Sequence, residues 1–234
     1  MMAEHPVALV TGSRKGIGRH LAEQLVRKGY LVVGCSREPV DWTLDGYTHV
    51  QADVSNEAHV KSLLSLVRQD FERLDVTVNN AGVASMNHAL LTPVETVDRI
   101  MGVNFRGTFL VARESAKLMR KRKFGRIVNL TTIAVPLALA GEAIYAASKS
   151  AVESLTRVLS REFAEFGITV NAIGPTPIET DLIKNVRPER IQDIIARLSI
   201  KRLGQPLDVF NVVEFFIRPE SEYVTGQVIY LGGA

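Results

Sequence analysis

The sequence predicts an α/β fold in which one seven-stranded parallel sheet is doubly wound, with helices on both of its faces. Stretches typical of strands and of helices alternate from Val7 to Tyr230, which favours parallel strands joined by right-handed crossovers. A glycine-rich turn joins the first strand to the first helix. We find no internal repeat, low-complexity tract or linker. Residues 1–234 are therefore expected to form a single domain, and a domain of this size buries roughly 70 to 75% of its unfolded surface.

The composition is that of an ordinary globular protein. The longest apolar run, residues 133–140, is interrupted by Pro136 and falls far short of the ~18 residues that a membrane-spanning helix needs. The first residues lack the features of a signal peptide, and a lone cysteine, Cys35, excludes an internal disulfide. A net charge of +3 is too small to indicate nucleic-acid binding. We expect a cytoplasmic protein with no metal site and no membrane or nucleic-acid partner.

The first strand is expected over residues 7–10, followed by the glycine turn and a helix that ends at Gly29. Glycines permit positive φ angles and let backbone N–H groups approach a pyrophosphate at the positively polarised start of a helix. We therefore predict a nucleotide-binding turn, although glycine turns also join strands and helices that bind nothing. The candidate cofactor contacts are Gly12, Ser13, Arg14, Lys15, Gly16, Ile17 and Gly18.

The end of the second strand, predicted over residues 31–35, indicates which dinucleotide fits. An NAD-binding enzyme usually has a carboxylate there for the ribose hydroxyls, whereas an NADP-binding enzyme needs a cation and no acid beside the 2′-phosphate. This chain has Ser36 and Arg37 at that point, and Arg14 and Lys15 are expected on the same side. These charges favour NADP(H), with solvated surface cations as the alternative.

The segment between Arg37 and Asp53 is short and contains Pro39, so a full crossover helix is not expected there. A third strand is predicted over residues 48–52. Asp53 and Val54 follow it, at a place where an adenine amino group could be held. Both residues are candidate cofactor contacts.

Two helix starts are predicted from capping residues. Ser55 or Asn56 is expected to cap a helix that runs to about residue 71. The residues Thr92-Pro93-Val94-Glu95 fit a capping box with proline at the first helical position. The helical region that follows should reach about residue 123, with a kink near residues 104–107.

The fourth strand, predicted over residues 76–78, ends in Asn79-Asn80-Ala81-Gly82. Small residues at the carboxyl end of a strand permit a ligand to approach closely. Asn80, Ala81 and Gly82 are therefore candidate cofactor contacts, and a mere tight turn is the alternative. Asn104 either is satisfied locally, as buried amides usually are, or holds a water beside Lys149.

A helix over about residues 143–165 carries Tyr145 and Lys149. Residues four apart share a helix face, so the phenol and the ammonium can be brought to the same point. A neighbouring cation stabilises a phenolate and lowers the phenol pKa from its usual value near ~10. Tyr145 would then be a usable general acid or base, unless the spacing is a coincidence.

The rest of the chain supplies the remaining elements of the sheet. Strands are predicted over residues 127–130, 169–173 and 228–230, and helices over residues 188–199 and 206–217. The stretch over about residues 176–207 lacks a clear strand and is the natural lid of a substrate site.

Together these motifs resemble those of the short-chain dehydrogenase/reductase family. The resemblance covers the chain from Val7 to Gly232 and rests on five motifs in order: Thr11-Gly12-x-x-x-Gly16-x-Gly18, Asn79-Asn80-Ala81-Gly82, Asn104, Tyr145-x-x-x-Lys149 and Tyr223-Val224-Thr225-Gly226-Gln227. It implies a Rossmann fold with strand order 3-2-1-4-5-6-7, a nicotinamide cofactor and usually a homotetramer. The 3-oxoacyl-carrier-protein reductases are the most similar members in loop lengths and in Arg202-Leu203-Gly204-Gln205-Pro206.

The resemblance also implies the roles of the site residues. Tyr145 would protonate the developing alkoxide, and Lys149 would lower the Tyr145 pKa and bind the ribose. Asn104 would keep a water that refills the proton. The family serine lies thirteen positions before the tyrosine, and 145 − 13 = 132 is Thr132 here, which would hold the carbonyl oxygen. The remaining cofactor contacts are expected at Pro175, Ile178 and Thr180.

Three positions depart from the family pattern. Thr132 keeps the hydroxyl of the serine, but its methyl group stiffens χ1, so we expect slower or narrower activity. Thr176 replaces a glycine and is expected to crowd the nicotinamide pocket. Lys123 keeps one basic position that the carrier-protein reductases use for their acidic carrier, but Phe166 occupies the other, which weakens the case for an acyl carrier protein as partner.

The sequence thus predicts hydride transfer between NADP(H) and a small carbonyl compound or secondary alcohol, of which a 3-oxoacyl thioester is one candidate. The alternative is an NADP-binding sensor or scaffold with weak or no turnover, whose site has drifted at Thr132 and Thr176.

Overall fold

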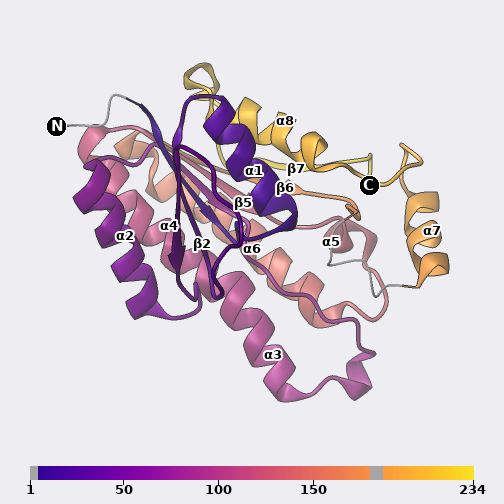
Figure 1. Cartoon of the computed structure of the whole chain (residues 1–234). Coiled ribbons are helices and arrows are strands. Elements are labelled where there is room, and N and C mark those ends of the chain that lie inside the picture. The colour runs from indigo at the N-terminus through magenta and orange to yellow at the C-terminus, as the bar shows by residue number, and fades with distance from the viewer. Residues whose placement is uncertain (1–4, 180–186) are drawn as a thin grey trace.

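The computed structural model describes residues 5–179 and 187–234. These residues contain a seven-stranded parallel sheet with the predicted order β3-β2-β1-β4-β5-β6-β7 (Figure 1). Its strands are β1 (Val7–Thr11), β2 (Leu31–Ser36), β3 (Tyr47–Gln51), β4 (Val76–Asn79), β5 (Gly125–Leu130), β6 (Ile168–Gly174) and β7 (Val228–Tyr230). The α-helices are α1 (Gly16–Arg27), α2 (Glu57–Phe71), α3 (Val94–Met101), α4 (Thr108–Met119), α5 (Ala134–Leu137), α6 (Ala143–Glu162), α7 (Pro188–Arg197) and α8 (Pro206–Ile217).

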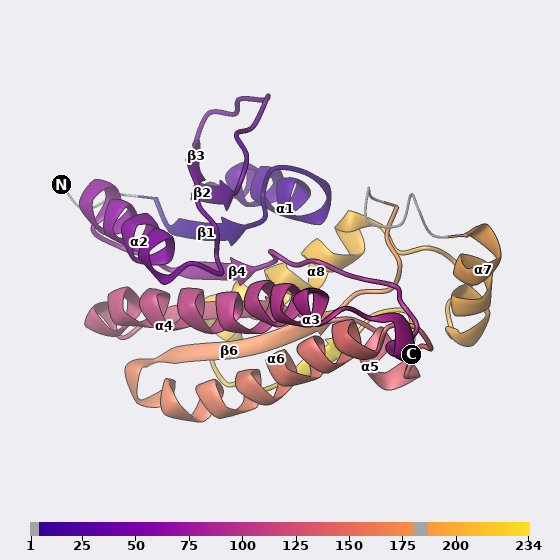
Figure 2. The ribbon, with the colours of Figure 1, turned by 90° about the horizontal axis from the view of Figure 1, so that it is seen from below.

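Helices cover both faces of the sheet (Figure 2). On one face, α1 and α8 pack together over the sheet, and on the other α2, α4 and α6 do so. The side chains of β1 alternate between the two cores: Leu9 faces one and Val10 the other. A strand buried on both faces needs apolar residues at successive positions, which is why the strands of this sheet read as continuous apolar runs.

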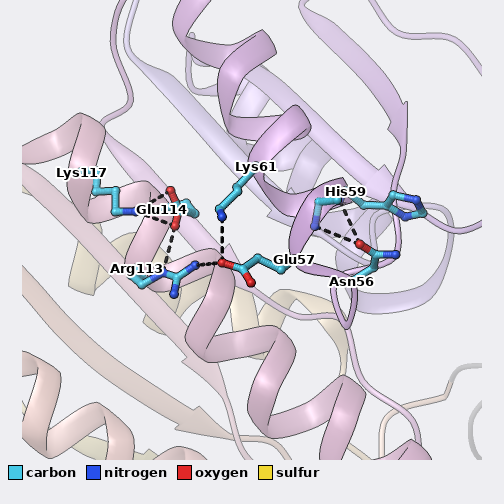
Figure 3. Close-up of polar contacts among 8 residues, drawn as sticks. Asn56, Glu57, His59, Lys61, Arg113, Glu114 and Lys117 are labelled. Atoms are coloured by element: carbon cyan, nitrogen blue, oxygen red, sulfur yellow. Dashed lines mark hydrogen bonds and ion pairs between the residues drawn. The ribbon is translucent and has the colours of Figure 1, made fainter.

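Asn56, rather than Ser55, caps α2. Its Oδ1 accepts hydrogen bonds from the N–H groups of Ala58 at 2.9 Å and His59 at 3.3 Å (Figure 3). At the same end of the helix, Glu57 accepts a hydrogen bond of 2.7 Å from Arg113 of α4 and lies 3.0 Å from the ammonium of Lys61. The ion pair with Arg113 joins α2 to α4, whereas the pair with Lys61 lies within α2.

The capping box predicted at residues 92–95 is wrong. α3 begins at Val94 with Pro93 as its N-cap, and no side chain caps it. The Thr92 hydroxyl donates to the His88 carbonyl at 3.1 Å instead. A short 3₁₀ helix over Ala89–Leu91 ends just before Thr92, and the Thr92 hydroxyl bonds back to this turn rather than serving as the acceptor that caps α3.

The predicted kink after α3 is a π-helical segment, Gly102–Gly107, that leads directly into α4. Such segments occur frequently at functional sites because the wider turn redirects side chains. Here the segment contains Asn104, which is fully buried. The kink thus turns an amide towards the centre of the molecule.

The prediction that no full helix joins β2 to β3 is confirmed, since residues 37–46, which the structure describes throughout, contain none. The helix predicted over residues 188–199 is α7. It lies within the segment predicted as a lid, of which residues 180–186 are outside the described ranges. None of the helices in those ranges combines the length and the apolar character that crossing a bilayer requires.

Candidate active site

A cleft of about 420 Å³ opens at the carboxyl ends of the strands. This volume lies within the range that binds small molecules. The cleft brings together most of the predicted site residues: Gly12, Lys15, Gly16, Ile17, Gly18, Asn80, Ala81, Gly82, Thr132, Tyr145, Lys149, Pro175 and Ile178. Thr180 lies outside the described residues.

The glycine turn fits the phosphates of a dinucleotide. Gly12 and Gly16 have positive φ angles of 68° and 60°, which residues with side chains rarely adopt. A Cβ on Gly18 would lie 2.2 Å from the Gly12 carbonyl oxygen, so only glycine lets α1 begin this close to the turn. None of the residues in the first turn of α1 is acidic. The amides at this helix start are therefore available to an anion.

Asn80 holds the glycine turn against the end of β4. Its side-chain amide donates to the carbonyl oxygens of Thr11 at 2.9 Å and Gly12 at 3.1 Å. The N–H groups of Asn80 and Ala81 donate in turn to the Thr11 hydroxyl at 3.1 and 3.0 Å. The Asn80 side chain thus braces the turn, and the small residues Ala81 and Gly82 form the wall of the cleft.

Ser13, one of the predicted cofactor contacts, does not border the site with its side chain. Ser13 is fully buried, and neither the cleft nor the cavity beside it includes this residue in its wall. Its hydroxyl lies 2.8 Å from the Tyr47 hydroxyl on β3. The sequence could not indicate this, because the partner lies on the strand at the edge of the sheet.

A second cavity, of about 210 Å³, adjoins the cleft and contains the residues predicted for the adenosine end of a cofactor. Its wall includes Arg14, Lys15, Ser36, Arg37, Asp53 and Val54. The expectation that no acid stands there is wrong, since Glu38 also lines this cavity and forms an ion pair with Arg14. Sequence reasoning stopped at Arg37, one residue too early.

Asp53 is fixed within that cavity. Its Oδ1 accepts two hydrogen bonds from Ser55, from the backbone N–H at 2.9 Å and from the hydroxyl at 2.7 Å. Burial raises the pKa of the Asp53 carboxyl, but the hydrogen bonds from Ser55 and the charge of Arg37 outweigh it and leave the pKa below its ordinary value. Asp53 is therefore an anionic acceptor at neutral pH.

Tyr145 and Lys149 border the cleft one turn apart on α6. Burial raises the Tyr145 pKa to about 12, a hydrogen bond with Thr132 partly opposes this, and Glu142 adds to it. Burial lowers the Lys149 pKa to about 8, and its ammonium donates to the Leu130 carbonyl at 2.7 Å. The prediction that Lys149 sets a lowered Tyr145 pKa is wrong for this arrangement, because burial of the phenol dominates.

The Thr132 hydroxyl lies at the predicted position of the family serine. It hydrogen-bonds to the Tyr145 phenol and accepts a hydrogen bond of 3.2 Å from the Ala134 N–H. Thr132 follows β5 and Tyr145 lies in the first turn of α6, so two separate elements direct their hydroxyls to one point. The threonine methyl group does not prevent this contact.

Asn104 is satisfied locally, which is one of the two alternatives that the sequence left open. Its amide donates to the Val83 carbonyl at 2.9 Å and to the Ser148 hydroxyl at 2.9 Å, and its Oδ1 accepts from the Val83 N–H at 2.8 Å. Ser148 immediately precedes Lys149 on α6. Asn104 therefore joins the segment after β4 to the helix that carries the phenol and the ammonium.

The Thr176 side chain, expected to crowd the nicotinamide pocket, lies close to two glycines. A Cβ on Gly204 would lie 2.5 Å from the Thr176 hydroxyl oxygen, and a Cβ on Gly232 would lie 2.7 Å from its methyl group. Both polar and apolar ends of this side chain thus lie against glycines elsewhere in the fold. Thr176 still borders the cleft, but two distant glycines make room for its side chain.

Sequence reasoning missed a buried carboxyl group in the cleft wall. Glu142 precedes α6, is 5% exposed, and lies 3.6 Å from the guanidinium of Arg190 on the lid helix α7. Burial raises the Glu142 pKa, and Arg190 opposes this. Arg190 also donates to the Ala140 carbonyl. The lid helix is thereby tied to the chain three residues before Tyr145.

The sequence profile of the family described as Enoyl-(Acyl carrier protein) reductase matches residues 12–233, nearly the whole chain. The chain belongs to the short-chain dehydrogenase/reductase family. This short-chain dehydrogenase/reductase is 32% identical over 239 residues to the 3-oxoacyl-[acyl-carrier-protein] reductase of Vibrio cholerae, a match that covers 100% of this chain and 98% of the relative. The enzyme of the same description from Staphylococcus aureus is 32% identical over 237 residues, with 97% of this chain and 96% of the relative covered.

Solved structures agree with this assignment. ElxO with NADP bound superposes with a TM-score of 0.90 at 28% sequence identity, covering 97% of each chain. A tyrosine-to-phenylalanine variant of ElxO with NADPH bound gives a TM-score of 0.89 at 28% identity and covers 97% of this chain and 96% of the other. The predicted Rossmann fold and family are thus confirmed.

Proposed function

We propose that this short-chain dehydrogenase/reductase transfers a hydride between NADP(H) and a carbonyl compound or secondary alcohol. The observation that carries the proposal is the convergence of Thr132, Tyr145 and Lys149 on the cleft that the glycine turn also borders. Carbonyl reduction needs hydrogen-bond donors at the oxygen that gains negative charge, and an acid that protonates it. The two hydroxyls meet the first need and the phenol meets the second.

NADP(H) is the cofactor that the structure supports best. Arg14, Lys15 and Arg37 border the cavity at the adenosine end, where a 2′-phosphate needs cations, and Glu38 in the same wall is neutralised by its ion pair with Arg14. The two ElxO structures, similar over almost the whole chain, hold NADP and NADPH. When bound, the nicotinamide supplies or accepts the hydride, and the protein orients it.

The chain's own residues handle the proton. The Tyr145 phenol is protonated at neutral pH, so in the reduction direction it can donate its proton to the substrate oxygen. Thr132 holds the same oxygen by a hydrogen bond. Lys149 borders the same cleft with its ammonium fixed on the Leu130 carbonyl, where it would be available to the ribose hydroxyls of a bound cofactor. Asn104 serves as a positioning residue for the helix that carries them.

Replacing Arg37 by aspartate should shift the cofactor preference towards NADH. Loss of a charged hydrogen bond, worth about 1.5 to 3 kcal/mol, should raise the Kd for NADPH about 10- to 100-fold. The Kd for NADH should stay the same or fall. Both constants can be measured from nicotinamide fluorescence. As a control, Lys121→Asp makes the same charge change on the exposed segment Arg120–Arg122 and should alter neither constant. An unchanged Kd for NADPH in Arg37→Asp would refute the contact between Arg37 and the phosphate.

We further propose a 3-oxoacyl thioester as the substrate. The curated relatives from Vibrio cholerae and Staphylococcus aureus carry the name 3-oxoacyl-[acyl-carrier-protein] reductase. Apolar residues of the cleft wall offer contacts to an acyl chain: Met86, Leu139, Ile191 and Ile194. Docking of an acyl carrier protein is a separate question, because Phe166 stands at one of the two positions where the carrier-protein reductases have a basic residue. Assembly into a homotetramer stays a prediction.

The substrate proposal predicts a ranking in an assay of NADPH oxidation. Acetoacetyl thioesters should be reduced with a kcat/KM at least about tenfold above that for cyclic ketones or simple sugars, because only the thioester fills the apolar wall and gains its burial energy. Comparison of acetoacetyl-CoA with the acyl carrier protein thioester would show whether the carrier contributes. Tight NADPH binding without oxidation by any member of the panel would instead support a sensor or scaffold.

A further inference from the structure

A chain of hydrogen-bonded side chains lies beside the adenosine end of the site. The Ser13 hydroxyl lies 2.8 Å from the Tyr47 hydroxyl, which in turn lies 2.9 Å from Nδ1 of His49. Nε2 of His49 lies 3.1 Å from the Ser36 hydroxyl. Ser13 belongs to the glycine turn, Ser36 ends β2, and the two middle residues lie on one face of β3. We refer to Ser13, Tyr47, His49 and Ser36 as the relay.

The Glu38 carbonyl determines the direction of every hydrogen bond in the relay. A carbonyl oxygen only accepts, and it lies 2.6 Å from the Ser36 hydroxyl and 3.2 Å from Nε2 of His49. Nε2 therefore carries a hydrogen, which leaves Nδ1 of the neutral ring as an acceptor. Tyr47 must donate to Nδ1, so it accepts from Ser13. Burial lowers the His49 pKa, which favours the neutral ring that this order requires.

Neighbouring residues leave room for the relay and hold it in place. A Cβ on Gly34 would lie 2.1 Å from the Tyr47 hydroxyl oxygen and 2.3 Å from that of Ser13, so a side chain at Gly34 would break their contact. The Trp42 ring packs on Tyr47 with 4.4 Å between ring centroids, and its Nε1 donates to the Arg14 carbonyl at 3.0 Å. The connection from β2 to β3 is thus fixed to both the relay and the glycine turn.

Each end of the relay immediately precedes a cation. Ser13 precedes Arg14 in the glycine turn, and Ser36 precedes Arg37 after β2. Both cations border the adenosine-end cavity. Because a chain of partly buried hydrogen bonds resists changes in length, the relay sets the spacing between the two segments that present these cations.

We propose that Tyr47 and His49 are positioning residues for the 2′-phosphate of NADP(H), which hold the glycine turn and the end of β2 at the spacing that the phosphate requires. This inference rests on the proposed function, because it assumes that NADP(H) is the cofactor. NAD(H) carries no phosphate at this position. Its binding should therefore depend much less on the relay.

Tyr47→Phe tests the proposal, because it removes one oxygen atom and keeps the ring that packs on Trp42. The Kd for NADPH should rise about 3- to 10-fold, the loss expected for one hydrogen bond, while the Kd for NADH changes less than about 2-fold. Both values come from titrations that follow nicotinamide fluorescence, without turnover. Tyr30→Phe removes a hydroxyl from another partly buried tyrosine, which lies next to the start of β2, and should leave both constants unchanged.

A double-mutant cycle with His49→Ala separates a relay from two independent contacts. If the residues act as one unit, Tyr47→Phe/His49→Ala should bind NADPH no more than about 2-fold more weakly than His49→Ala alone. Equal weakening of NADH and NADPH binding in Tyr47→Phe would show a merely structural role and overturn the proposal, as would an unchanged Kd for NADPH. Failure of the unmutated protein to bind NADPH would refute the proposed cofactor itself.

Discussion

Replacing Tyr145 by phenylalanine should lower kcat for carbonyl reduction by roughly 10² to 10⁴-fold, the range that positioned general acids contribute. The substitution removes the phenol hydroxyl that meets Thr132, while the ring stays in the first turn of α6. The Kd for NADPH should change by less than about 2-fold, because the glycine turn and the adenosine-end cavity are untouched. Single-turnover measurements with saturating NADPH would isolate the chemical step.

Two comparisons sharpen this test. Tyr223 is completely exposed at the far end of the chain, so Tyr223→Phe should retain full activity and controls for loss of any tyrosine hydroxyl. Thermal unfolding should show that Tyr145→Phe remains folded, since Thr132 can still accept from the Ala134 N–H. Retention of most of the activity would mean that another group supplies the proton and that the assignment of Tyr145 is wrong.

Much of the fold could be predicted because it depends on local sequence. Helix α8 was predicted to the residue, because Pro206 marks its first turn and an apolar stretch follows. The strands of the sheet stand out as apolar runs between turns, and their order follows from the family resemblance. The capping box at residues 92–95 failed because the Thr92 hydroxyl, which would have to accept a hydrogen bond from the first turn of α3, donates back to the His88 carbonyl instead.

The residues that border the cleft could also be predicted, but the directions in which their side chains point could not. The glycine turn identifies the backbone that can approach a phosphate, yet nothing in its spacing shows that Ser13 turns towards Tyr47. The same holds for Glu142, whose partner Arg190 lies far along the chain. Such contacts depend on how the sheet order brings distant segments together, and residue patterns along the chain do not encode that order directly.

The Tyr145 pKa shows how burial can outweigh a sequence argument. Four-residue spacing predicted that Lys149 would stabilise the phenolate, but the ammonium donates to the Leu130 carbonyl and burial of the phenol raises its pKa. Desolvation disfavours the charged form of both groups, so it raises the Tyr145 pKa and lowers the Lys149 pKa.

Substitution of Thr132 should have the second large effect. Valine and serine, which are similar to threonine in size, separate the role of its hydroxyl from that of its methyl group. Thr132→Val keeps the branched shape and removes the hydroxyl, so kcat should fall roughly 10² to 10³-fold, as for loss of an oxyanion-hole donor. Thr132→Ser keeps the hydroxyl and removes the methyl group that restricts χ1, so its activity should equal or exceed that of the unmutated protein. Both follow from one observation, the contact between the hydroxyl of Thr132 and the phenol of Tyr145.

The valine variant needs a stability control, because the Thr132 hydroxyl also accepts from the Ala134 N–H. Leaving that buried N–H without a partner costs about 1 to 3 kcal/mol, so Thr132→Val should unfold at a lower temperature and must be assayed well below it. The serine variant restores the acceptor and should recover both stability and turnover. The serine variant lacks the methyl group of threonine, and the valine variant lacks its hydroxyl. Loss of activity in the valine variant, together with retained activity in the serine variant, therefore assigns the effect to the hydroxyl. Full activity of the valine variant would show that Thr132 does not hold the substrate oxygen, and Tyr145 would then be its only hydroxyl donor among the groups placed here.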